Sequence, residues 1–142
     1  MKESLILKLS ANISMGFDMG DILDTDRLLR RIDFIDPNFG IKDDGIPASS
    51  NFTLKKLKNG KYKKGLSVDL ERLTTYAESI QDVKRFRLYA VLAFFIRSIR
   101  LDCINDGVPH PAHSLIIGEG LHKKSIARKL AKNAVRINYP SR

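Results

Sequence analysis

The sequence predicts a single domain, residues 1–142, of the α/β or α+β class, with a mixed sheet that includes a β-hairpin and with a basic amphipathic helix near its end. Three observations lead to this prediction. The length of 142 residues is close to the commonest domain size. Short runs of branched and aromatic residues alternate with stretches of helical periodicity. Asn59-Gly60 separates two such runs as a hairpin turn does, and a hairpin favours a mixed sheet over a purely parallel one.

The first fifty residues contain two elements of ambiguous type and two loops. Residues 5–13 fit either a strand or a short helix, because their apolar positions match neither period cleanly. The acidic stretch 18–26 indicates a loop, and its end can cap a helical turn over residues 27–32. The same residues also alternate enough to form a strand, so both assignments stay open. Prolines and glycines in residues 36–50 indicate a second loop.

The hairpin occupies the next segment. Residues 52–58 and 61–68 flank Asn59-Gly60, a pair that suits a type I′ turn because both central residues then need positive φ. In the polar segment that follows the hairpin, we expect a short helix over residues 70–77. Residues 86–91 are rich in aromatic and branched side chains and predict a strand.

The rest of the chain predicts a short helix, two short strands and one longer helix. The short helix covers residues 93–99, with Phe94, Phe95 and Ile99 as expected core contacts. The strands cover residues 101–104 and 114–117, and Pro109 and Pro111 should hold the intervening backbone extended. The longer helix covers residues 123–137. Its apolar arc consists of Ile126, Ala127, Leu130, Ala131 and Ala134, and its opposite side carries Lys124, Arg128, Lys132 and Arg136.

Positive charge is concentrated in the later part of the chain. The formal net charge is +9, yet residues 1–50 carry 6 Lys/Arg against 9 Asp/Glu, while residues 51–142 carry 19 against 7. A concentrated positive field favours anionic partners such as nucleic acid, another polyanion or an acidic protein. Simple solubility is the alternative explanation.

Two segments carry the candidate phosphate-binding residues. The hairpin contains Lys55, Lys56, Lys58, Lys61, Lys63 and Lys64. Lysines of this kind meet phosphates without demanding geometry, although charges at a hairpin tip also discourage edge-to-edge aggregation. The second segment is the turn with Gly118 and Gly120 before the longer helix, where backbone N–H groups can meet an anion beside Lys123, Lys124, Arg128, Lys132 and Arg136. A plain turn is the simpler explanation of these two glycines, since no P-loop spacing is present.

Two histidines form the candidate catalytic group. His110 and His113 are three positions apart in His110-Pro111-Ala112-His113, directly before a short apolar strand. Histidine is the usual general acid or base near neutral pH, so the pair fits phosphodiester or acyl chemistry, with Arg30 holding a phosphate. The alternative is structural: His113 bonds to a backbone carbonyl.

Several other functions are not expected. Cys103 stands beside Asp102 in an apolar context, which argues against a lowered thiol pKa and against a nucleophile. The carboxylates of residues 18–26 suit capping and loop solvation, so we expect no metal and no cofactor. The longest apolar run, residues 88–96, is too short to cross a bilayer, and the first residues do not resemble a secretory signal. We therefore expect a cytoplasmic protein without a membrane partner.

Three functional hypotheses follow. The first is a basic domain that binds nucleic acid or polyphosphate, and it predicts a steep dependence on salt. The second is a small enzyme acting on a phosphorylated or nucleotide substrate, and it requires His110, His113 and Arg30 to converge in a cleft. The third is an interaction or regulatory subunit whose basic face docks on an acidic partner.

Overall fold

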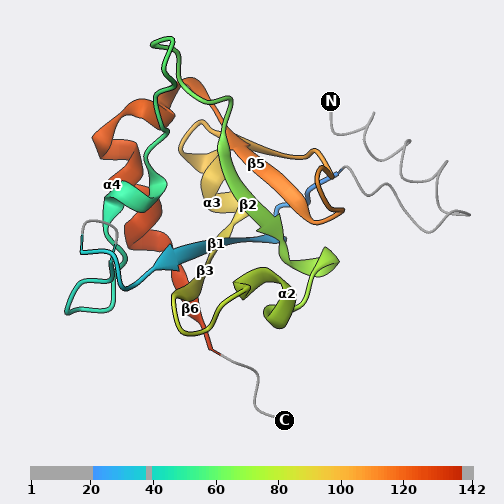
Figure 1. Ribbon diagram of the computed structural model, residues 1–142. Helices are drawn as coiled ribbons and strands as arrows, with labels where there is room; N and C mark the ends of the chain where they lie inside the picture. Colours follow the sequence, from blue (N-terminus) through green and yellow to red (C-terminus); the bar gives the residue numbers. More distant parts are fainter. Residues whose placement is uncertain (1–20, 38–39, 139–142) are drawn as a thin grey trace, which may run out of the picture.

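The computed structural model describes residues 21–37 and 40–138, which form one domain around a six-stranded sheet (Figure 1). The strand order is β4-β5-β2-β1-β3-β6, and every pair of neighbours is antiparallel. The α+β alternative is therefore confirmed, and the sheet is antiparallel instead of mixed. The strands are β1 Arg27–Asp33, β2 Leu66–Leu70, β3 Phe86–Leu92, β4 Asp102–Asn105, β5 His113–Ile117 and β6 Val135–Ile137.

Helices cover both faces of this sheet. The α-helices are α2 Tyr76–Ile80, α3 Ala93–Ser98 and α4 Lys124–Asn133, and the 3-10 helices are η2 Ser49–Phe52, η3 Glu71–Leu73 and η4 Glu119–His122. The larger core lies under α4 and η2, where Leu28, Phe52 and Leu130 are fully buried. A smaller cluster with Leu29, Ile80 and Leu88 lies on the other face, beside α2. Figure 1 shows α4 and α2 on opposite sides of the strands.

The ambiguity over residues 27–32 is resolved in favour of a strand. β1 pairs with β3 along its whole length, from Arg27 opposite Leu92 to Asp33 opposite Phe86. It also pairs with β2, so it is a central strand that buries apolar side chains on both faces. Burial on both faces weakens the alternation of apolar and polar residues by which a half-buried strand is recognised.

The predicted longer helix is correct at its start and wrong at its end. α4 ends at Asn133, and Ala134 adopts an extended conformation. The next three residues, Val135–Ile137, form β6. The N–H of Ala134 still donates to the carbonyls of Leu130 and Ala131, which closes the last turn. The next residues then complete the edge of the sheet against β3, where Arg136 lies opposite Tyr89. Arg136 therefore belongs to a strand and not to the helical row of cations.

The lysine hairpin is present, but it lies outside the six-stranded sheet that was expected to include it, and its turn differs from the expected one. Its arms share one bridge between Lys56 and Tyr62, and β2 begins only at Leu66. The N–H of Gly60 donates to the Leu57 carbonyl at 3.0 Å, and Gly60 has a φ of 86° while Asn59 does not enter the positive-φ region. This is a type I turn followed by a left-handed glycine, not a type I′ turn. The Asn59 side chain instead accepts the N–H of Lys61 at 2.9 Å.

The remaining predictions have mixed outcomes. The strands over residues 86–91, 101–104 and 114–117 and the helix over residues 93–99 are confirmed to within two residues at each end. Ile99 and Phe95 pack on the core, but Phe94 is 62% exposed, so it is not a core contact. The helix over residues 70–77 is displaced into η3 and α2. Residues 5–13 and 18–20 lie outside the described residues.

Candidate functional site

A cavity of about 240 Å³ opens on the face of the sheet opposite α4. It brings together His110, His113 and Arg30, the three residues that the sequence singles out for catalysis. Leu29, Val68 and Phe86 supply its apolar lining, and Arg31, Ser67 and Asp69 complete its polar lining. Gly118 and Gly120 do not line this cavity.

A tight turn explains why the two histidines meet. The N–H of His113 donates to the carbonyl of His110 at 2.9 Å, so the expected extended backbone is wrong here. Residues three apart in such a turn have Cα atoms within about 7 Å of each other. The two imidazole centroids lie 6.0 Å apart, with ring planes at 85°. The amide of Asn105, at the end of β4, fixes the loop by donating to the carbonyls of Pro111 and His113 at 2.8 and 2.9 Å.

His113 is held on both sides of its ring. Its Nδ1 lies 2.6 Å from Oδ1 of Asp106, and its Nε2 lies 3.3 Å from Oγ of Ser67. Gly107 allows this arrangement, because its φ of 64° reverses the chain while its N–H donates to the His113 carbonyl. A carboxylate at Nδ1 favours the proton on that nitrogen, which leaves Nε2 as the basic atom facing Ser67.

His110 lies closer to solvent than His113. Its side chain is 45% exposed, and its Nε2 is 3.6 Å from Oδ1 of Asp69. Asp69 is buried, accepts a hydrogen bond from Oγ of Ser79 at 2.7 Å, and lies 3.9 Å from Nη1 of Arg31. The exposed imidazole of His110 thus has the buried carboxylate of Asp69 as its neighbour.

Arg30 has a different position from the one expected of a phosphate ligand. Its Nε donates to the carbonyl of Asn51 at 2.8 Å, and its Nη1 donates to the carbonyl of Ser67 at 2.7 Å. Burial, and secondarily the charge of Arg31, lower the pKa of Arg30 to about 10, so it stays charged near neutral pH. Arg30 therefore ties η2 to β2 and fixes the strand that carries Ser67.

The glycine turn before α4 has a packing role. Gly118 has a φ of 146°, and a Cβ atom there would lie 2.6 Å from Cδ2 of Leu101. The 3-10 helix η4 separates this turn from α4, which begins at Lys124. Close approach of the chain to Leu101 requires glycine here, independently of any anion.

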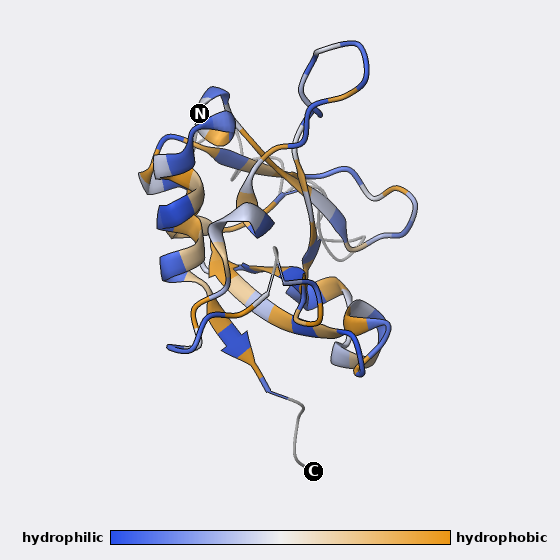
Figure 2. Ribbon diagram, turned by 60° about the vertical axis from the view of Figure 1, so that its left-hand side comes forward, coloured by the Kyte–Doolittle hydropathy of each residue, from blue (hydrophilic) through white to orange (hydrophobic). Residues whose placement is uncertain are grey.

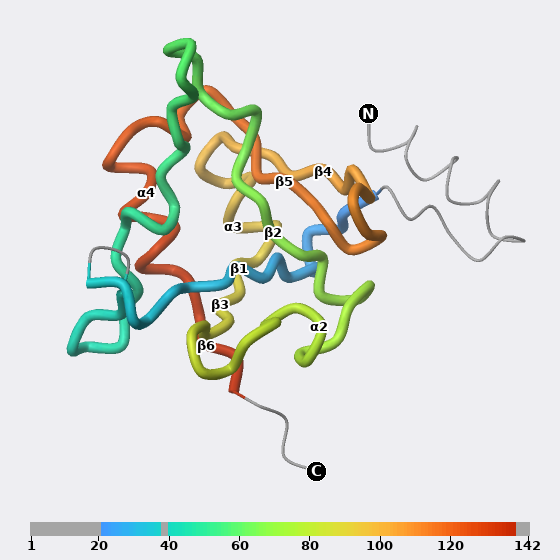
Figure 3. Tube along the Cα trace, viewed as in Figure 1, coloured from blue at the N-terminus to red at the C-terminus, as the bar shows by residue number. Residues whose placement is uncertain are grey.

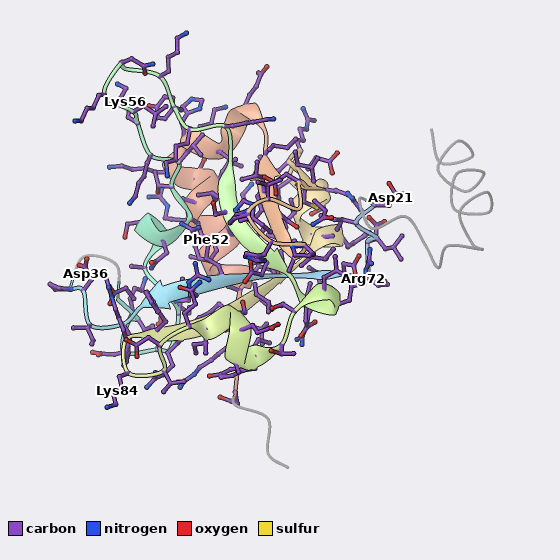
Figure 4. All side chains as sticks on the ribbon, turned by 45° about the vertical axis from the view of Figure 1, so that its right-hand side comes forward. Asp21, Asp36, Phe52, Lys56, Arg72 and Lys84 are labelled. Carbon is purple, nitrogen blue, oxygen red and sulfur yellow. The ribbon has the colours of Figure 1, made fainter. Side chains whose placement is uncertain are left out.

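The lysine ribbon, residues 55–64, is a separate and strongly cationic feature. Its six lysines are all exposed, and none of them forms an ion pair within the part of the chain that the structure describes. Figures 2 and 3 show the ribbon as a largely hydrophilic loop projecting from the top of the molecule. In Figure 4, Lys56 on this ribbon stands well away from Phe52 in the core.

Aromatic contacts connect the ribbon to the segment that leads into α4. The Tyr62 and His122 ring centroids are 5.5 Å apart, and Nζ of Lys56 lies 5.7 Å from the Tyr62 ring centre. Beyond His122, the exposed cations of the described residues are Lys123, Lys124, Arg128, Lys129 and Lys132, followed by Arg136 in β6. Glu119 is the one acidic residue in the segments 51–65 and 118–138 taken together.

Other candidate chemistry receives little support. Within residues 21–37 and 40–138, no group of three or more metal-binding side chains is found, and no helix has the length and hydropathy needed to cross a bilayer. Burial raises the pKa of the Cys103 thiol to about 11. This agrees with the expectation that Cys103 is not a nucleophile.

Sequence reasoning gave no catalytic role to four polar residues of the site: Arg31, Ser67, Asp69 and Asp106. Asp106 carries a weak signal, because it precedes His113 by seven residues with a turn-forming glycine between them. Ser67 and Asp69 carry none, since they reach the histidines only through the pairing of β2 with β5, in which Asp69 lies opposite His113. Comparison with known proteins gives no match to any protein family, curated protein or solved structure, so the function has to be inferred from this chain's own residues.

Proposed function

We propose that this protein binds nucleic acid or another polyphosphate through its lysine ribbon, with the cations of α4 extending the binding surface. The observation that carries the proposal is the lack of neutralising partners for the six exposed ribbon lysines in the described part of the chain. Lysines without carboxylate partners keep their full attraction for phosphates, and binding releases the counterions that surround a nucleic acid.

Four arginines elsewhere in the fold contrast with these lysines. Arg27, Arg72 and Arg85 each pair with a carboxylate at 3.0 Å or less, and Arg97 pairs with two, Asp24 and Asp102. Such pairs contribute little to the external field, because opposite charges at this distance cancel beyond a Debye length of about 8 Å. The net positive field therefore originates mainly from the ribbon and α4.

The composition of the ribbon favours contacts to phosphates over contacts to bases. Lysine is a flexible point charge, and phosphate contacts carry no sequence information directly. Tyr62 is the aromatic residue within the ribbon, and its ring already contacts His122 and Lys56. We therefore propose binding that depends little on base sequence.

Fluorescence anisotropy with labelled oligonucleotides tests the proposal. The Lys61→Glu/Lys63→Glu double variant should bind at least tenfold more weakly than the unmodified protein. The matched control is Lys42→Glu/Lys84→Glu, because both of its lysines are exposed and the net charge changes equally. Figure 4 shows Lys84 at the opposite end of the molecule from Lys56.

The control separates location from net charge. If both double variants weaken binding equally, the affinity depends on the net charge of the protein and not on the position of the lysines in the ribbon. Undetectable binding to DNA, RNA and heparin at low salt would remove the proposal altogether.

A further inference from the structure

The cavity and the ribbon together suggest a chemical role. Two imidazoles lie in one cavity with their centroids 6.0 Å apart, so each ring can reach a different oxygen of the same phosphodiester. A general acid or base must approach within about 2.6–3.2 Å of the atom it serves. Arg31, in the same lining, offers a cation: its described polar contacts all involve Nη1, and a guanidinium has five N–H donors.

We propose that this cavity cleaves RNA, with His113 as the general base and His110 as the general acid. The inference rests on the proposed function, because the ribbon has to hold the RNA. His113 is the base because Asp106 occupies its Nδ1 and leaves Nε2 facing the cavity. His110 is the acid because an imidazolium there has the Asp69 carboxylate 3.6 Å away and solvent to restore its proton.

The reaction uses a nucleophile that RNA itself carries. Nε2 of His113 takes the proton of the ribose 2′-hydroxyl as the 2′ oxygen forms its bond to phosphorus. The bond from phosphorus to the 5′ oxygen of the next nucleotide breaks, and His110 donates a proton to that leaving oxygen. The products are a 2′,3′-cyclic phosphate and a 5′-hydroxyl end. No oxidant, reductant or further reactant enters this step, and exchange with solvent resets the two imidazoles.

Chain connectivity links the ribbon to the cavity. Lys64 precedes Ser67 by three residues, a span of about 10 Å at roughly 3.3 Å per residue of extended chain. Gly65 and Leu66 between them are buried, so this connection is anchored to the sheet. α4 packs on the face of the sheet opposite the cavity. The ribbon, and not the helix, is therefore the cationic segment that would bring RNA to the cavity.

Ser67 offers the competing chemistry and must be tested. Its Oγ lies 3.3 Å from Nε2 of His113, in the position where the 2′-hydroxyl would give up its proton. A serine nucleophile would also need preorganised donors for an oxyanion. In the proposed reaction Ser67 forms no bond to phosphorus, whereas in serine catalysis its Oγ is the nucleophile.

The decisive experiment compares single-stranded RNA with DNA of the same sequence. RNA should yield fragments with 2′,3′-cyclic phosphate ends by mass spectrometry, and DNA should stay intact because it lacks the nucleophile. His110→Ala and His113→Ala should each slow cleavage at least about 100-fold. Ser67→Ala should still yield 2′,3′-cyclic phosphate ends, because the nucleophile is the 2′-hydroxyl of the RNA. His122→Ala, which removes a histidine outside the cavity, should stay within a few-fold of the unmodified rate.

Binding is measured separately with 2′-O-methyl RNA, which cannot be cleaved by this route. Each variant is prepared identically, and its thermal unfolding is recorded to confirm folding. Binding without cleavage overturns the inference and leaves the polyanion proposal intact, whereas absence of binding removes both. Cleavage of DNA, cleavage that the histidine variants retain, or loss of cleavage in Ser67→Ala would each overturn the assignment.

Discussion

At the scale of single residues, arginine and lysine have different roles in this protein. Arg27 forms a bidentate pair with Glu71, with its Nε and Nη2 at 2.8 and 2.5 Å from the two carboxylate oxygens. Arg97 donates to Asp24, to Asp102 and to the carbonyl of Ile22, which joins three separate segments. The planar guanidinium suits such forked contacts, whereas lysine is a hydrated point charge. The arginines with carboxylate partners therefore stabilise the fold, while the ribbon lysines remain available to external anions.

Cys103 provides a test of burial at one residue. The residue is 4% exposed, and burial raises the pKa of its thiol to about 11. Because the pKa is raised, the thiol stays protonated at pH 8 in the folded protein, although an unfolded cysteine would be partly ionised there. We expect slow alkylation by iodoacetamide at pH 8 in native protein and rapid alkylation in denaturant. Equally fast reaction in both conditions would show that the thiol is accessible.

Gly118 provides a test of close packing. Gly118→Ala forces a side chain into positive φ and places a Cβ atom 2.6 Å from Leu101, so it should cost about 2–4 kcal/mol of unfolding free energy. Gly45→Ala is the control, because Gly45 also has positive φ but no atom within 4 Å of the added Cβ. The control should lose on the order of 1 kcal/mol. Urea denaturation measures both, and equal losses would contradict the packing argument.

At the scale of elements, α4 is held by one narrow apolar side. Ala127, Leu130 and Ala131 are buried, while the remaining helical residues except Ile126 are exposed. The small alanines allow the helix to approach the core around η2 and the sheet, and Leu130 fills the space between them. No side chain caps the start of α4, so its stability depends on this packing.

Leu130→Ala tests that dependence. Removing a fully buried leucine should cost about 2–5 kcal/mol through lost burial and the remaining cavity. Lys132→Ala, on the exposed side of the same helix, should change the unfolding free energy by no more than about 0.5 kcal/mol. Chemical denaturation followed by circular dichroism compares the two, and similar values would mean that α4 does not dock as described.

Local signals in the sequence account for part of these elements. The periodicity of residues 124–133 predicts where α4 begins and which side is buried, but its end depends on the pairing of Val135 with Ala90, far away in the chain. The hairpin is predictable from Asn59-Gly60, whereas its turn type follows from a side-chain contact between Asn59 and Lys61. His110 and His113 are adjacent by local spacing. Ser67 and Asp69 join them only through strand pairing, which a single sequence does not reveal.

At the scale of the whole molecule, the two functional features are arranged around one sheet. α4 and the larger core occupy one face, and the histidine cavity occupies the other. The second arm of the ribbon returns to the body of the protein and continues into β2, the strand that carries Ser67 and Asp69 (Figure 1). A polyanion on the ribbon would therefore lie near the strand that lines the cavity.

The central claim is that the ribbon lysines act together as the anion-binding surface, and the salt dependence of binding tests it most directly. The slope of log K against log salt concentration counts released counterions, at about 0.7 per phosphate contact for a single strand. Lys61→Gln/Lys63→Gln should therefore reduce the magnitude of the slope by about 1.4, while Lys42→Gln/Lys84→Gln should leave it unchanged. A flat slope for the unmodified protein, or equal reductions in the two double variants, would contradict the claim.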